Sequence, residues 1–95
     1  MAEPLDEVRL AGLEEELPQW RVEDGCLVRD VQAPSFLDGI GFVVRIAEAA
    51  EEMNHHPDID IRWRTIHVAL VTHSAGSRIT DLDVELARQI DQIVG

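Results

Sequence analysis

The strongest structural signal in this 95-residue chain lies in residues 57–73, which read PDIDIRWRTIHVALVTH. Apolar and polar residues alternate through 58–64 and again through 66–73, and this period of two is typical of strands with one buried face. The chain must reverse near 62–65, although no common turn dipeptide marks the position. We therefore expect an antiparallel pair of strands in this part of the chain.

Two shorter stretches earlier in the chain, residues 20–23 and 26–31, are also predicted to be strands. They flank Asp24-Gly25, a dipeptide typical of a two-residue hairpin turn. Pro34 ends the second of them, since proline cannot donate a backbone hydrogen bond.

Three amphipathic helices are predicted around these strands, in residues 5–17, 35–54 and 80–94. Pro4 suits the first turn of the first helix, and Pro18 stops it. Ser35 and Thr80 are each followed three residues later by an aspartate, a spacing that resembles a capping box. The residues expected on the buried helix faces are Leu5, Val8, Leu10, Leu13, Leu17, Ile40, Val43, Val44, Ile46, Ala47, Ala50, Met53, Val84, Ala87, Ile90 and Val94.

The element order is therefore α-β-β-α-β-β-α. Strands joined by hairpins or by one helix favour an antiparallel sheet with helices on one face. We expect an α+β two-layer sandwich with a four-stranded antiparallel sheet, forming a single domain over residues 1–95.

Composition excludes some classes of partner. The net charge is −11, which argues against a surface for nucleic acid or an anionic membrane. One cysteine, Cys26, cannot form an internal disulfide and fits a reducing compartment. Residues 1–6 lack the features of a signal peptide, and no apolar stretch approaches the roughly 20 residues of a membrane span. We expect a cytoplasmic protein.

Histidines supply the most informative chemistry. His55 and His56 lie where a helix gives way to a strand, and His73 lies at the far end of the returning strand. An antiparallel hairpin would bring all three to one edge of the sheet. Together with Glu51 and Asp83 nearby, these histidines are the residue types expected in an acid–base site, because imidazole titrates near neutral pH. The pattern offers no candidate for a catalytic nucleophile.

Each of these residues also has a structural explanation. His55 and His56 could stabilise a helix C-terminus, Asp83 could serve only as a cap, and Glu51 could be a solvated helix residue. A zinc site could use His55, His56, Asp58 and His73, although this spacing matches no standard pattern. His67 lies about 20 Å along the strand from His73, so we expect it to be a sheet-face or interface residue.

The whole pattern resembles the pterin-4a-carbinolamine dehydratase family. Its elements are Glu51, His55-His56-Pro57, Trp63, His73 and Asp83, in that order and at that spacing. The resemblance extends from about residue 13 to residue 94. It includes the segment WRVEDG at 20–25, Phe36, Phe42, residues 43–47 (VVRIA) and Leu86-Ala87. The loop at 74–79 is about one residue longer than in close relatives, so Asp81 competes with Asp83 for the family's aspartate. Asp83 is preferred, because Leu86-Ala87 follow it at the family's spacing.

The resemblance implies a hydro-lyase that dehydrates 4a-hydroxytetrahydropterin to quinonoid dihydropterin, in support of tetrahydrobiopterin recycling, with no metal and no organic cofactor. By position, His55 and His73 match the acid–base pair, and His56 matches the histidine that binds and orients the pterin. Glu51 and Asp83 match carboxylates that hold the imidazoles.

Pro57 and Trp63 belong to the same motif, although Trp63 could serve packing alone. A homodimer or homotetramer is expected. The alternatives are a non-catalytic dimerising interaction module and a histidine-based metal-binding protein.

Overall fold

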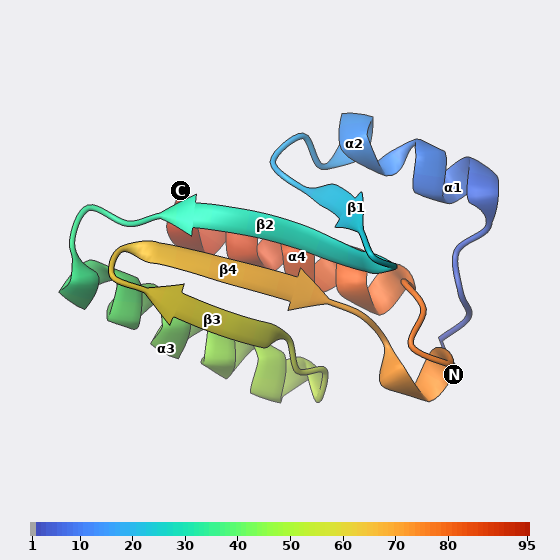
Figure 1. The fold of residues 1–95 in the computed structure, drawn as a ribbon. Coiled ribbons are helices and arrows are strands. Elements are labelled where there is room, and N and C mark those ends of the chain that lie inside the picture. The colour runs from blue at the N-terminus through green and yellow to red at the C-terminus, as the bar shows by residue number, and fades with distance from the viewer. Residues whose placement is uncertain (1) are drawn as a thin grey trace.

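The computed structural model describes residues 2–95 and contains one sheet with helices beside it (Figure 1). Its elements are α1 (Glu7–Ala11), α2 (Leu13–Glu16), β1 (Arg21–Glu23), β2 (Cys26–Gln32), α3 (Phe36–Met53), β3 (Asp58–Arg62), β4 (Thr65–Leu70), the 3₁₀ helix η1 (His73–Ala75) and α4 (Asp81–Val94). The strand order is β1-β2-β4-β3, and every neighbouring pair is antiparallel. The predicted α+β fold is confirmed.

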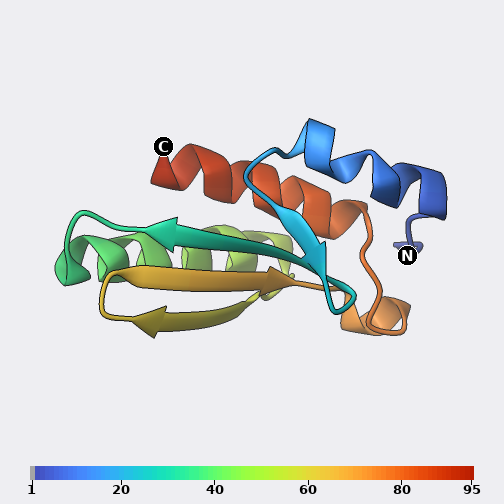
Figure 2. The same ribbon diagram turned by 45° about the horizontal axis from the view of Figure 1, so that its top comes forward.

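The layers of the fold are clear in two views. Helices α3 and α4 cover the same face of the sheet, and within residues 2–95 the opposite face carries no helix (Figures 1 and 2). The short helices α1 and α2 lie beside α4, and ion pairs from Arg9 to Asp81 and from Arg88 to Glu16 join them to it. At one end of the sheet lie the end of α3, the start of β3, the end of β4 and the start of α4.

The first hairpin forms as its turn residues predict. Asp24 and Gly25 both have positive φ, 52° and 78°, which a two-residue turn between twisted strands requires. Arg21 pairs with Val28 across this hairpin.

The core lies between the sheet and the two long helices. Ile66, Val68 and Leu70 alternate along β4 and are fully buried against it. Gly39 allows α3 to approach the sheet, because a Cβ at this position would lie 3.3 Å from Cδ1 of Ile61. The core residues are Leu13, Leu17, Trp20, Leu27, Val31, Ala33, Ile46, Ala50, Ile66, Val68, Leu70, Ile79, Val84, Leu86, Ala87 and Ile90.

The N-terminal segment differs from the prediction of one continuous helix. It forms two short helices that separate at Gly12, a residue with low helix propensity. Asp6 caps α1 by accepting a hydrogen bond from the backbone N–H of Arg9. Pro4 does not lie in a helical turn but forms an isolated bridge to Thr80, and Val8 is exposed rather than buried.

Three other predictions need correction. Trp63 does not continue the strand. It lies in the turn between β3 and β4, with a φ of 53° and an exposed fraction of 71%. The fourth strand ends at Leu70, so His73 begins a 3₁₀ helix rather than ending a strand. On α3, Val44 and Ala47 are exposed, because the buried stripe is narrower than the apolar pattern suggested.

None of the helices within residues 2–95 combines the length and the apolar content that crossing a bilayer requires.

Candidate acid–base site

His55 is the imidazole that the fold holds most firmly. Helix α3 ends at Met53, and Asn54 adopts a left-handed conformation that turns the chain toward β3. The backbone N–H of His55 donates to the carbonyl oxygen of Ala50 at 3.0 Å. The His55 side chain is buried, and its Nε2 lies 2.6 Å from Oδ1 of Asp83.

Asp83 occupies the first turn of α4 and is completely buried. Its Oδ2 accepts the backbone N–H of Thr80 at 2.9 Å and the hydroxyl of Thr72 at 2.8 Å. Thr80 completes a capping box with Asp83. The same carboxylate thus caps the helix through one oxygen and contacts an imidazole through the other, so the two explanations of Asp83 are compatible.

The hydrogen-bond partners of Asp83 define which nitrogen of His55 carries a proton. Two donors already converge on Oδ2, and the oxygens of a carboxylate only accept hydrogen bonds. Oδ1 must therefore accept from Nε2–H of His55. In the neutral ring this leaves the Nδ1 lone pair free to accept a proton, and in the cation Nδ1–H is the proton available to donate.

His56 is the exposed neighbour of His55 and has a different partner. Its Nε2 lies 2.5 Å from Oε1 of Glu51, which projects from the last turn of α3. Both side chains are accessible, with exposed fractions of 56% and 76%. An accessible imidazole beside a carboxylate can bind a ligand that approaches from solvent. Pro57 follows at once and separates this pair from the start of β3.

His73 reaches the same end of the sheet from the other side. It is exposed, and its Nδ1 lies 3.3 Å from Oγ of Ser77. Backbone hydrogen bonds between Thr72 and Arg78, 2.9 and 3.3 Å long, close the loop that carries it. Because Thr72 also contacts Asp83, the backbone of His73 is tied to the carboxylate that holds His55.

Two of the sequence-based candidates lie elsewhere. Trp63 follows the last residue of β3, whereas His56 precedes its first, so the full length of the strand separates them. Asp81 is exposed and forms an ion pair with Arg9 at 3.3 Å. The structure therefore brings together His55, Thr72 and Asp83, places His56 and His73 beside them, and leaves Trp63 at the opposite end of the sheet.

Thr72 is the residue of this cluster that sequence reasoning did not identify as functional. A signal was present, since Thr72 follows Ile66, Val68 and Leu70 in the inward-facing register of an otherwise apolar stretch. A buried hydroxyl at such a position requires a hydrogen-bond partner. Threonine is also common in strands, however, so strand propensity alone was enough to explain Thr72.

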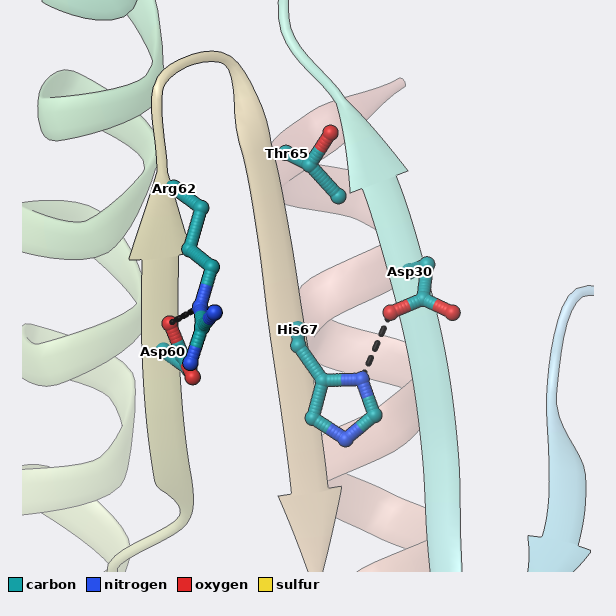
Figure 3. Close-up of a pocket in the computed structure, with 5 residues that line it drawn as sticks. All are labelled: Asp30, Asp60, Arg62, Thr65 and His67. Atoms are coloured by element: carbon teal, nitrogen blue, oxygen red, sulfur yellow. Dashed lines mark hydrogen bonds and ion pairs between the residues drawn. The ribbon is translucent and has the colours of Figure 1, made fainter.

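A hollow lies on the open face of the sheet, away from these residues. Its volume is about 460 Å³, and its lining residues are Asp30, Asp60, Arg62, Thr65 and His67 (Figure 3). His67 lies between the two aspartates in the strand register, and its Nδ1 is 2.6 Å from Oδ1 of Asp30. The open-face location explains why His67 cannot join the other histidines.

Within residues 2–95, His, Cys, Asp and Glu side chains do not form a group of three or more that could hold a metal ion. Burial is the main cause that raises the pKa of the Cys26 thiol, and the charge of Asp58 adds to it. A raised pKa lowers the fraction of reactive thiolate at neutral pH.

The fold and these side chains together define a small α+β protein suited to proton transfer. A family model described as pterin 4 alpha carbinolamine dehydratase matches residues 3–93. The chain belongs to this family, as the sequence pattern predicted.

Relatives agree with this assignment. A protein of Mycobacterium avium (strain 104), named provisionally as a pterin-4-alpha-carbinolamine dehydratase, is 59% identical over 80 residues, covering 84% of each chain. A protein of Mycolicibacterium smegmatis with the same provisional name is 58% identical over 78 residues, covering 82% of each.

Solved structures share the fold. A Brucella melitensis protein described as a transcriptional coactivator/pterin dehydratase superposes with a TM-score of 0.92 at 28% identity, covering 98% of this chain and 100% of the other. A pterin dehydratase-like protein identified as a RuBisCO assembly factor in the alpha-carboxysome has a TM-score of 0.69 at 20% identity, covering 81% and 90%. The second likeness supports the fold alone.

Proposed function

We propose that this chain is a hydro-lyase that converts 4a-hydroxytetrahydropterin, the 4a-carbinolamine, into quinonoid dihydropterin and water. Membership of the family supports this reaction. The observation that carries the proposal is the buried contact between His55 and Asp83, at the end of the sheet that also carries His56 and His73. Such a reaction would support the recycling of tetrahydrobiopterin.

The reaction requires two proton transfers on a flat bicyclic ring. The bond between C4a and the hydroxyl oxygen breaks, and the oxygen leaves as water after it gains a proton. N5 loses its proton, and the freed electron pair forms the double bond between C4a and N5. One proton is given and one is taken, so a matched acid and base are sufficient.

His55 and His73 are the proposed acid–base pair. Asp83 fixes the His55 ring so that Nδ1 remains available, and it stabilises the imidazolium that forms when Nδ1 takes a proton. His73 is exposed and comes from a separate element, so it can approach the substrate from another direction. Each positioned group of this kind contributes about 10²–10⁴-fold to the rate.

His56 and Glu51 are proposed to bind and orient the pterin. The carboxylate restrains the imidazole from one side, which leaves the other ring nitrogen of His56 to contact a polar edge of the substrate. Their exposure fits a role at the entrance to the site rather than in its floor.

The direct experiment follows the formation of quinonoid dihydropterin by its absorbance. The substrate, 4a-hydroxytetrahydropterin, is generated and mixed with purified protein. The expected rate exceeds the rate in buffer and rises linearly with protein concentration. A rate equal to that of buffer would contradict the proposed function. A parallel sample with a strong chelator should keep full activity, and loss of activity there would instead support a metal-dependent protein.

A homodimer or homotetramer is also proposed. Leu37 and Val44 lie one above the other on the outer face of α3, with exposed fractions of 77% and 53%, and apolar exposure of this kind is typical of association surfaces. Light scattering should give a mass of two or four chains. A monomer would contradict this proposal, and an oligomer without dehydratase activity would favour the interaction-module alternative.

A further inference from the structure

Thr72 and Thr80 form a directional chain of hydrogen bonds that ends on Asp83. The Thr72 hydroxyl donates its single proton to Oδ2 of Asp83 at 2.8 Å. Its oxygen lies 2.7 Å from the Thr80 hydroxyl, so Thr80 must be the donor in that contact. The Thr80 oxygen in turn accepts the backbone N–H of Leu82 at 3.2 Å. Every hydroxyl proton in the chain has one assigned acceptor.

The backbone holds this chain of hydroxyls in place. Thr72 and Arg78 exchange backbone hydrogen bonds in both directions, and Thr80 is the N-cap of α4. The exposed fractions of Thr72, Thr80 and Asp83 are 2%, 0% and 0%, so water does not compete for their polar atoms. A buried and fully paired network of this kind fixes its members in one geometry.

We infer that Thr72 is a positioning residue that sets the tautomer of His55 through Asp83. With the Thr72 hydroxyl on Oδ2, the carboxylate presents Oδ1 to Nε2–H of His55, and Nδ1 is left to exchange protons with the substrate. This role rests on the proposed function, because it assigns Nδ1 as the atom that takes part in the reaction. Thr72 itself does not contact the substrate.

The tautomer can be measured without any assay of activity. In the ¹⁵N NMR spectrum of the neutral imidazole of His55, the expected result is a protonated Nε2 and an unprotonated Nδ1. A spectrum with the proton on Nδ1 would overturn the inference in the unmodified protein, before any variant is made.

Variants then test whether Thr72 is the cause. Thr72→Val keeps the shape and removes the donor, whereas Thr72→Ser keeps the donor. We expect Thr72→Val to give a mixture of His55 tautomers and to lower kcat by about 10–100-fold at similar KM, as loss of a hydrogen bond behind a functional group typically does. Thr72→Ser should retain the tautomer and most of kcat.

The matched control is Thr65→Val, at the first residue of β4, whereas Thr72 follows the end of that strand. The Thr65 hydroxyl donates to Oε1 of Gln32 at 2.9 Å on the open face, remote from Asp83. This variant should leave the His55 tautomer and kcat unchanged. A folded Thr72→Val protein with the original tautomer would overturn the inference, and so would a mixture of tautomers in Thr72→Ser. An inactive unmodified protein with Nε2 protonated, whose tautomer changes in Thr72→Val but not in Thr72→Ser, would contradict the proposed reaction while supporting the role of Thr72 in setting the tautomer.

Discussion

Nε2 of His55 lies 2.6 Å from Oδ1 of Asp83, although 28 residues separate them in the chain. The contact joins the segment that follows α3 to the first turn of α4, and both helices cover the same face of the sheet (Figure 1). The two residues are therefore expected to matter for stability and for the proposed chemistry alike, and substitutions can separate these effects.

Asp83→Asn should lower both the stability of the fold and the proposed activity. The amide replaces one acceptor oxygen by a donor. Either the donors from Thr72 and Thr80 then lose their acceptor, or the amide N–H faces Nε2 of His55 and favours the tautomer with its proton on Nδ1. We expect the free energy of unfolding to fall by about 1–3 kcal/mol. We also expect kcat to fall by about 10²-fold, the lower end of the range for a lost acid–base group. Urea denaturation and steady-state kinetics measure the two quantities.

Asp81→Asn is the matched control, since Asp81 is exposed and contacts Arg9 rather than a histidine. Exposed ion pairs contribute about 0–1 kcal/mol, so stability and kcat should stay close to those of the unmodified chain. Equal losses in the two variants would contradict the assignment of Asp83.

Glu51→Gln should affect substrate binding more than turnover. The carboxylate restrains the exposed His56, and the amide would hold the imidazole less well. We expect KM to rise by about 10-fold, which corresponds to about 1.4 kcal/mol, with a smaller change in kcat. Glu52→Gln changes the exposed neighbour on the same helix and should leave KM unaltered. A change confined to kcat in Glu51→Gln would place this residue in the chemical step instead.

The open face provides a prediction about pH. The pKa of Asp30 is lowered, chiefly by its hydrogen bond with His67, and the hydrogen bond from Arg21 adds to this effect. Since the folded pKa lies below the unfolded value of about 3.9, the contribution to stability is present above that pH and is lost as pH falls through the folded pKa. The contribution is small, because the Asp30 side chain is 44% exposed.

His67→Ala removes the largest cause of that shift. An NMR titration should show the pKa of Asp30 moving up toward its ordinary value, and kcat should not change, because His67 lies on the opposite face from His55. An unshifted Asp30 would show that another group controls this carboxylate.

Two glycines of α3 should respond in opposite ways to alanine. At Gly41 an added Cβ meets no atom within 4 Å, so alanine should raise the unfolding free energy by about 0.5–1 kcal/mol through helix propensity. At Gly39 the Cβ would lie 3.3 Å from Cδ1 of Ile61, and the crowding should cancel or reverse that gain. Thermal denaturation compares the two alanine variants. An equal increase in unfolding free energy at both positions would contradict close packing at Gly39.

Local chemistry explains which parts of the fold were predictable. Asp24-Gly25 is a turn wherever it joins two strands, because both residues tolerate positive φ. Thr80 and Asp83 define the start of α4 by a reciprocal cap. The reversal near residues 62–65 was predicted, but the turn conformation of Trp63 was not, since a tryptophan rarely adopts a φ of 53° and only the pairing of the flanking strands imposes it.

The sequence predicted which histidines form the candidate site, but it did not predict every residue that contacts them. Spacing predicted His55 and His73 at one sheet edge, and it favoured Asp83 over Asp81 only through the position of Leu86-Ala87, since both aspartates fall in the first turn of α4. Burial distinguishes them, and burial depends on tertiary packing. Thr72 was missed for the same reason, because its hydroxyl gains a role only when α4 brings Asp83 against it.

The most direct test compares the unmodified protein with the double variant His55→Ala, His73→Ala in the dehydration assay. We predict that the unmodified protein accelerates the formation of quinonoid dihydropterin and that the double variant loses most of this rate. Circular dichroism should show that both remain folded. A folded double variant with full activity would contradict the central claim that these two imidazoles carry the proton transfers.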